Sequence, residues 1–115
     1  MKALFILNDP PYGTERSYNG LRLAGSMVKE EGVSVTVFLM GDAVSCAKRG
    51  QKTPDGYYNI ERMLKPITHR GAVMLCGSCM DARGLAEAEI ADGCGRSSLA
   101  ELTALSINAD KILVF

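Results

Sequence analysis

The chain has 115 residues, with 13 basic and 13 acidic side chains and a formal net charge of zero. Its length suits a single domain over residues 1–115, and 47% hydrophobic residues are too many for a disordered protein. Zero net charge argues against a nucleic-acid binder, and no apolar run approaches the ~20 residues that span a membrane.

The first half of the chain alternates apolar runs with helical patterns, which predicts a parallel sheet with helices packed against its faces. Lys2–Leu7 is apolar after the lysine, as in a strand buried on both faces. A helix is expected from about Glu15 to Glu31, with Thr14 or Ser17 as its cap and Gly32 as its end. β-branched alternation then predicts a strand over Val33–Met40.

After this strand we expect a short helix reaching Cys46 and a loop over Lys48–Gly56. This loop is the longest polar stretch rich in glycine and proline, so we expect it to be the most mobile segment. Ser97 or Ser98 caps the last helix, with Glu101 as the capping-box partner of Ser98. A helix is predicted over Tyr57–Arg70, a strand over Ala72–Leu75 and a further helix over Asp81–Ala91. A tight turn over Gly93–Arg96, a last helix with Leu99 to Ile107 and a closing strand over Lys111–Phe115 complete the prediction.

Ligands of such folds meet the protein at the carboxyl ends of the strands, where three loops are expected to lie together: 8–14, 41–56 and 76–84. In the first loop, Tyr12, Gly13 and Thr14 lack the glycine patterns of nucleotide-binding sites and suit a turn that leads into a helix. His69, the only histidine, is expected at the surface at a helix end. We therefore predict no bound cofactor.

Cys76 is the strongest candidate for chemistry, because it stands where a buried strand ends and a helix begins. Unpaired N–H groups and the helix dipole favour the thiolate there. Gly77 lets the backbone approach the sulfur, and Arg83 lies about two turns along and is able to return towards it. The alternative is that Cys76 is simply a small apolar residue at the end of a strand.

Cys79 completes a C-x-x-C pair, which is typical of redox chemistry or metal binding. A zinc site needs two more ligands, and neither Cys46 nor Cys94 belongs to a second such pair, so no metal is predicted. Cys94 lies between two glycines and suits a turn. With no secretion signal in the short apolar N-terminal run, we expect a cytoplasmic protein in which thiols predominate over disulfides.

Several motifs together make the chain resemble the DsrE/DsrF-like family, which includes subunits of sulfur relays. The resemblance runs almost end to end, through Pro11–Thr14, the strand Val33–Met40, the run Arg70–Cys76, the pair Arg83-Gly84 and the closing Ala109–Phe115. It implies a three-layer α/β/α domain with a mostly parallel, five-stranded sheet, assembling as a homo-trimer or homo-hexamer. In the relay members the cysteine matching Cys76 carries a persulfide between donor and acceptor proteins.

Cys79 departs from those relay members, in which no second cysteine follows three residues on. Its attack on a Cys76 persulfide would release sulfide and leave a disulfide. The leading hypothesis is therefore a sulfur-trafficking protein in which Cys76 accepts and donates sulfane sulfur, with Cys79 and Cys46 as resolving thiols. The alternative is a redox-sensing or small-ligand-binding regulatory module. A third hypothesis is that the oligomeric assembly itself is the function and that the cysteine site is inert. Homo-oligomerisation is expected separately, because so short a chain leaves an apolar helical face to cover.

Overall fold

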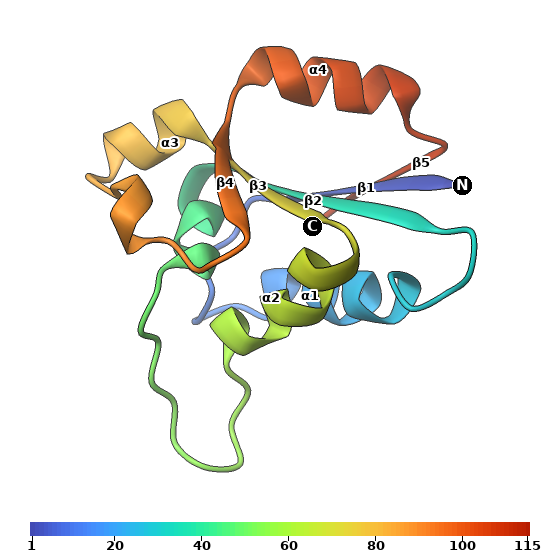
Figure 1. Ribbon diagram of the computed structural model, residues 1–115. Helices are drawn as coiled ribbons and strands as arrows, with labels where there is room; N and C mark the ends of the chain where they lie inside the picture. The colour runs from blue at the N-terminus through green and yellow to red at the C-terminus, as the bar shows by residue number, and fades with distance from the viewer.

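Five parallel strands form the centre of the computed structural model, which describes residues 1–115 (Figure 1). Their spatial order is β4-β3-β2-β1-β5. Each neighbouring pair is parallel, so the sheet is wholly rather than mostly parallel. The strands are β1 Lys2–Leu7, β2 Ser34–Leu39, β3 Ala72–Cys76, β4 Cys94–Ser97 and β5 Lys111–Val114.

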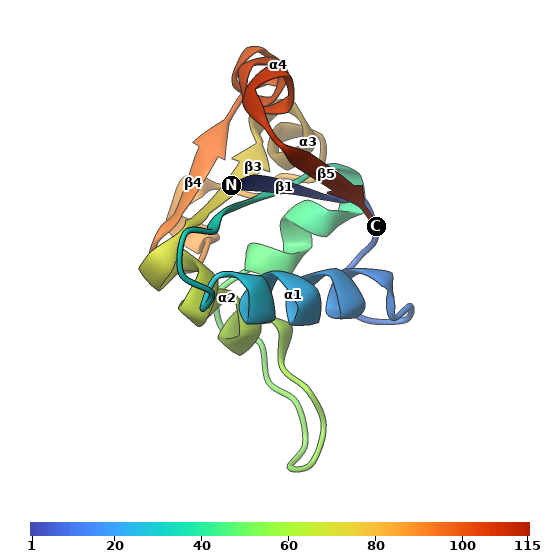
Figure 2. The same cartoon turned by 90° about the vertical axis from the view of Figure 1, so that its right-hand side faces the viewer.

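Helices cover both faces of this sheet, which confirms the predicted α/β architecture in three layers (Figures 1 and 2). Helices α1 and α2 lie together on one face, and α3 and α4 lie on the other. None of the helices is long and apolar enough to cross a membrane. The helical segments are α1 Arg16–Met27, the 3₁₀-helix η1 Gly41–Ala47, α2 Ile60–Arg70, α3 Gly77–Ala82, the 3₁₀-helix η2 Glu87–Glu89 and α4 Leu99–Asn108.

The two faces of the sheet bury unequal cores. Alternating side chains of the central strands point to opposite faces, so Phe5 enters the larger cluster beneath α1 and α2, while Leu4 enters a smaller one beneath α4. That smaller cluster has four buried members, Leu4, Phe38, Cys76 and Leu102. Cys76 therefore lies on the more thinly covered face.

Two helices are shorter than predicted. Helix α1 ends at Met27 rather than near Glu31, because the residues after Val28 are polar or exposed and give a further turn nothing to bury. The chain reverses at Gly32, whose φ is +76°. Helix α2 starts at Ile60 because Asn59 caps it by accepting a hydrogen bond from the Arg62 amide.

Two predictions near the C-terminal half are wrong. Residues 81–91 do not form one helix: α3 ends at Ala82, Gly84 follows with a φ of +62°, and only the short η2 comes after it. The segment Gly93–Arg96 is not a tight turn, because Cys94–Ser97 pairs with β3 as the edge strand β4. This strand has no run of apolar side chains, so its sequence does not resemble a buried strand.

The segment between η1 and α2, residues 48–59, is a long loop that projects away from the sheet (green in Figure 1). Its base is held by side chains from the first loop and from α2. The Tyr12 hydroxyl donates to Gln51 Oε1 at 2.6 Å and accepts from the Ile60 amide at 3.1 Å. Glu61 accepts from the amides of Gly50 and Gln51. The loop is thus tied to the start of α2.

Candidate functional site

Cys76 ends strand β3 and is the N-cap residue of helix α3, the position that its sequence context predicted. Its neighbours in the small core cluster hold it in place, and the residue is 7% exposed. The residue is therefore largely shielded from bulk water without being sealed inside the protein. Because β2 is the strand next to β3, the start of η1 lies beside it at the carboxyl edge of the sheet.

The pKa of the Cys76 thiol is lowered by local hydrogen bonds. Burial acts against ionisation, but the Ser78 hydroxyl, 3.3 Å from Cys76 Sγ, the Cys79 thiol and the amides of Cys79 and Ser78 together stabilise the thiolate more strongly. Helix α3 has only six residues, so these individual donors matter more than the long helix dipole that the sequence suggested. The arrangement favours a nucleophilic sulfur.

Cys79 has the opposite tendency. Burial and its hydrogen bond to Cys76 raise the pKa of the Cys79 thiol, and the nearby Gly41 amide and Arg83 offset this only in part. Of the two thiols, Cys76 is therefore the easier to deprotonate and Cys79 the harder. This difference suits Cys76 as the nucleophile and Cys79 as a hydrogen-bond donor to it.

Arg83 returns towards the site but contacts the backbone of Cys79 rather than Cys76. Its Nη1 donates to the Cys79 carbonyl at 3.1 Å, and its Nε and Nη2 lie 3.0 and 2.9 Å from Asp42 Oδ1. These contacts join the end of α3 to the start of η1. Arg83 therefore fixes the helix that carries both cysteines.

Arg96 is a charged neighbour of Cys76 that the sequence reasoning missed. The register of β4 on β3 sets Arg96 beside Leu75 and Ser97 beside Cys76. From there Arg96 forms a bidentate ion pair with Asp81 of α3, with its Nη1 2.8 Å from Oδ1 and its Nη2 2.9 Å from Oδ2. Its guanidinium occupies the space that a side chain at Gly77 would fill. Only the strand pairing of β4 reveals this placement.

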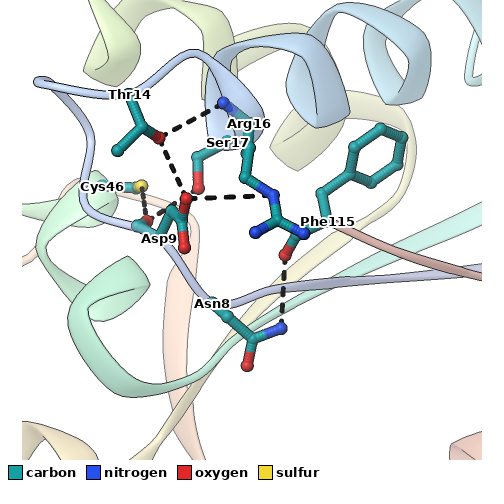
Figure 3. A network of polar contacts seen from close by, with 7 residues as sticks. All are labelled: Asn8, Asp9, Thr14, Arg16, Ser17, Cys46 and Phe115. Atoms are coloured by element: carbon teal, nitrogen blue, oxygen red, sulfur yellow. Dashed lines mark hydrogen bonds and ion pairs between the residues drawn. The ribbon is translucent and has the colours of Figure 1, made fainter.

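Three candidate residues of the first loop, Tyr12, Gly13 and Thr14, make contacts within and between the loops. Tyr12 holds the base of the loop 48–59, as described above, and Gly13 turns the chain with a φ of +95°. The Thr14 hydroxyl donates to the Asp9 carboxylate at 3.0 Å and accepts from the Arg16 amide (Figure 3). None of these contacts reaches Cys76.

Cys46 is fully buried, and its thiol lies 3.8 Å from the Asp9 carbonyl (Figure 3). Burial raises the pKa of the Cys46 thiol to about 12, so it stays protonated near neutral pH. This argues against Cys46 as a resolving thiol.

Cys94 lies at the opposite end of β4 from Cys76, paired with Val73, and burial raises the pKa of its thiol to about 11. His69 is exposed in the last turn of α2, as predicted. No group of three or more His, Cys, Asp or Glu side chains is gathered as a metal site would require. The chemistry of the carboxyl edge is therefore concentrated in the pair Cys76 and Cys79.

Comparisons with known proteins agree with this fold and these motifs. Protein YchN of Escherichia coli K12 is 40% identical over 116 residues, covering 99% of this chain and 98% of its own. The uncharacterized protein MJ0989 of Methanocaldococcus jannaschii is 35% identical over the full length of both chains.

Solved structures give the same result for the fold. The crystal structure of ychN from E. coli matches with a TM-score of 0.94 at 39% identity, covering 100% of this chain and 99% of that one. The protein MTH1491 from Methanobacterium thermoautotrophicum shares the fold alone, with a TM-score of 0.76 at 13% identity, covering 99% and 98%. The DsrE/DsrF-like family model matches residues 1–115. The chain therefore belongs to the DsrE/DsrF-like family, which is generally related to sulfur relay.

Proposed function

We propose that the protein carries sulfane sulfur as a persulfide on Cys76. The observation that carries this proposal is the hydrogen-bonded Cys76 thiol at the end of β3, largely shielded from solvent and with a lowered pKa. A carrier needs both properties. The thiolate is the form that attacks sulfur, and shielding slows the loss of the product to free thiols.

The proposed step exchanges one sulfur–sulfur bond for another. The Cys76 thiolate attacks the terminal sulfur of a donor persulfide, so that a Cys76–sulfur bond forms and the donor's own sulfur–sulfur bond breaks. The donor leaves as a thiolate, and no external oxidant or reductant is needed. An acceptor thiolate then takes the terminal sulfur from Cys76 in the same manner. Donor and acceptor are here proteins with a reactive cysteine.

A second candidate function rests on the contact between the two thiols. Because Cys79 hydrogen-bonds Cys76, its deprotonated form is placed to attack the inner sulfur of a Cys76 persulfide. That step forms a Cys76–Cys79 disulfide and releases hydrosulfide. The same Cys76–Cys79 disulfide also forms when the two thiols reduce a disulfide bond in another molecule. In that case the protein would be a redox sensor.

Sulfur uptake tests the leading proposal directly. The reduced protein is incubated with inorganic polysulfide and its intact mass is measured, alongside Cys76→Ser, Cys79→Ser and, as the matched control, Cys94→Ser. We expect the mass of one added sulfur in every protein except Cys76→Ser, with longer retention in Cys79→Ser because no neighbouring thiol expels it. Equal uptake by Cys76→Ser, or none by the wild type, would overturn the proposal.

Incubation in a thiol–disulfide redox buffer separates the second candidate from the first. A reversible Cys76–Cys79 disulfide in a protein that takes up no sulfur would favour the sensor. Sulfur uptake that survives in Cys79→Ser and is lost in Cys76→Ser favours the carrier.

A further inference from the structure

Arg96 brings positive charge to Cys76 from the neighbouring edge strand. The pairing of β4 with β3 sets Arg96 one residue away from the level of Cys76. Asp81 is the main cause that raises the pKa of Arg96, and the charges of Glu87 and then Cys76 make smaller contributions, which agrees with a guanidinium within electrostatic range of the sulfur. The other charged groups nearby are Glu87, which faces Arg96, and the pair Arg83 and Asp42, on the Cys79 side.

Gly77 provides the space that this arrangement needs. A Cβ atom at Gly77 would lie 2.8 Å from Arg96 Nε and 2.9 Å from Cζ, closer than real side chains come. The guanidinium is thus packed against the residue that directly follows Cys76. Any larger residue at position 77 would displace the guanidinium from this place.

The hydrogen bonds of Arg96 leave one of its donors free. Nη1 and Nη2 are both used on the Asp81 carboxylate, whereas Nε–H has no protein acceptor. Nε is also the atom closest to the vacant Cβ position of Gly77. Arg83 differs in this respect, because its Nε, Nη1 and Nη2 all have protein partners.

The inference drawn from these contacts rests on the carrier function proposed above. We propose that Arg96 binds the anionic sulfur at Cys76, with Nε–H donating to the terminal sulfur of the persulfide. That sulfur lies ~2.05 Å beyond Cys76 Sγ, and its negative charge needs a partner of its own. The site then accepts anionic sulfane-sulfur species, such as inorganic polysulfide, in preference to neutral ones.

The charge preference of Cys76 is measured by two alkylating reagents of similar size, anionic iodoacetate and neutral iodoacetamide. Both react with the same thiolate, so the ratio of their rates reports the local potential and not the extent of ionisation. Rates at Cys76 are followed by peptide mass mapping in the full chain. Arg96→Met removes the charge, and Gly77→Ala displaces it while every charge in the protein is kept.

Each variant has a matched control. Arg49 pairs with Asp92 at 2.9 Å, so Arg49→Met removes an arginine from a similar ion pair away from Cys76. Gly95 has open space around its Cβ position, so Gly95→Ala adds a methyl group that displaces nothing. Arg96→Lys keeps the charge and checks that the effect is not a loss of folding.

We expect the ratio of iodoacetate to iodoacetamide rates to fall about threefold to tenfold in Arg96→Met and Gly77→Ala, the effect of losing one unit charge a few ångströms away near the surface. Arg96→Lys and both controls should stay near the wild type. An unchanged ratio in both test variants, or a Cys76 that reacts with neither reagent, would overturn the role of Arg96. Failure of the wild type to take up sulfur from polysulfide would instead overturn the carrier function. The ratio of alkylation rates would still report the charge that Arg96 brings to Cys76.

Discussion

The ionisation of Cys76 depends on donors that single substitutions remove. Ser78→Ala deletes the hydroxyl 3.3 Å from Cys76 Sγ, and the pKa of the thiol should rise because the thiolate loses a hydrogen bond. Alkylation of Cys76 by iodoacetamide at pH 7 should slow roughly threefold to tenfold. Ser106→Ala, in α4, is the control, since Ser106 bonds only the Leu102 carbonyl. Equal rates in all three proteins would contradict this role for Ser78.

The buried Cys46 thiol predicts a pH dependence of stability. Its pKa rises from an ordinary 9.0 to about 12 on folding, so between these values the unfolded chain loses a proton that the folded one keeps. This contribution is complete below pH 9, and the free energy of unfolding should then fall by up to ~1.4 kcal/mol per pH unit as the pH rises towards 12.

Cys46→Ala removes that contribution. Urea unfolding under reducing conditions should show the variant less stable than the wild type at pH 7, and the difference should shrink steadily from pH 9 to 11. Parallel stability curves for the two proteins would mean that Cys46 does not control the alkaline loss of stability.

At the scale of elements, the Tyr12 hydroxyl connects the first loop, the loop 48–59 and helix α2. Tyr12→Phe removes both of its hydrogen bonds and leaves the first amide of α2 without this acceptor. We expect a loss of about 1–2 kcal/mol in the free energy of unfolding and faster proteolysis within residues 48–59. Tyr57→Phe, at a residue 73% exposed, should change neither quantity. Identical cleavage of both variants would show that the loop is held by other contacts.

The strands with apolar side chains were predictable from the sequence, and the edge strand β4, which has no apolar run, was not. The bounds Lys2–Leu7 match β1 because every residue after the lysine is apolar. By contrast β4, with the sequence Cys-Gly-Arg-Ser, is an edge strand whose side chains are short or polar. Its place depends on main-chain pairing with β3, which no local pattern encodes.

The same distinction applies to the candidate site. Cys76 and Cys79 could be selected because the end of an apolar strand is visible in the sequence, and α3 then brings both thiols together. Arg96 could not, since its approach to Gly77 exists only once β4 is paired. Tyr12, Gly13 and Thr14 were motif residues whose contacts proved to support the loops rather than the sulfur.

At the scale of the whole molecule, helix α4 and the edge strand β5, which lie close to one another in Figure 2, both carry exposed apolar side chains. Helix α4 buries only Leu102, although most of its other large side chains are apolar. Ile107 on this helix is 77% exposed, and Val114 on the edge strand β5 is 63% exposed. Leu99 on α4 and Ile112 on β5 are exposed as well. Surfaces of this kind are typical of contacts between subunits.

We therefore expect a homo-oligomer, as DsrE-like proteins often are, with α4 and β5 contributing to its contacts. Ile107→Glu combined with Val114→Glu should shift the mass measured by size-exclusion chromatography with light scattering towards that of a monomer, because burying two carboxylates in an interface is costly. Both side chains are already exposed, so the fold of the subunit should persist by circular dichroism. Leu23→Glu, at an exposed apolar residue of α1 on the other face, is the control and should keep the wild-type mass. A monomeric wild type, or dissociation caused only by Leu23→Glu, would contradict this assignment of the interface.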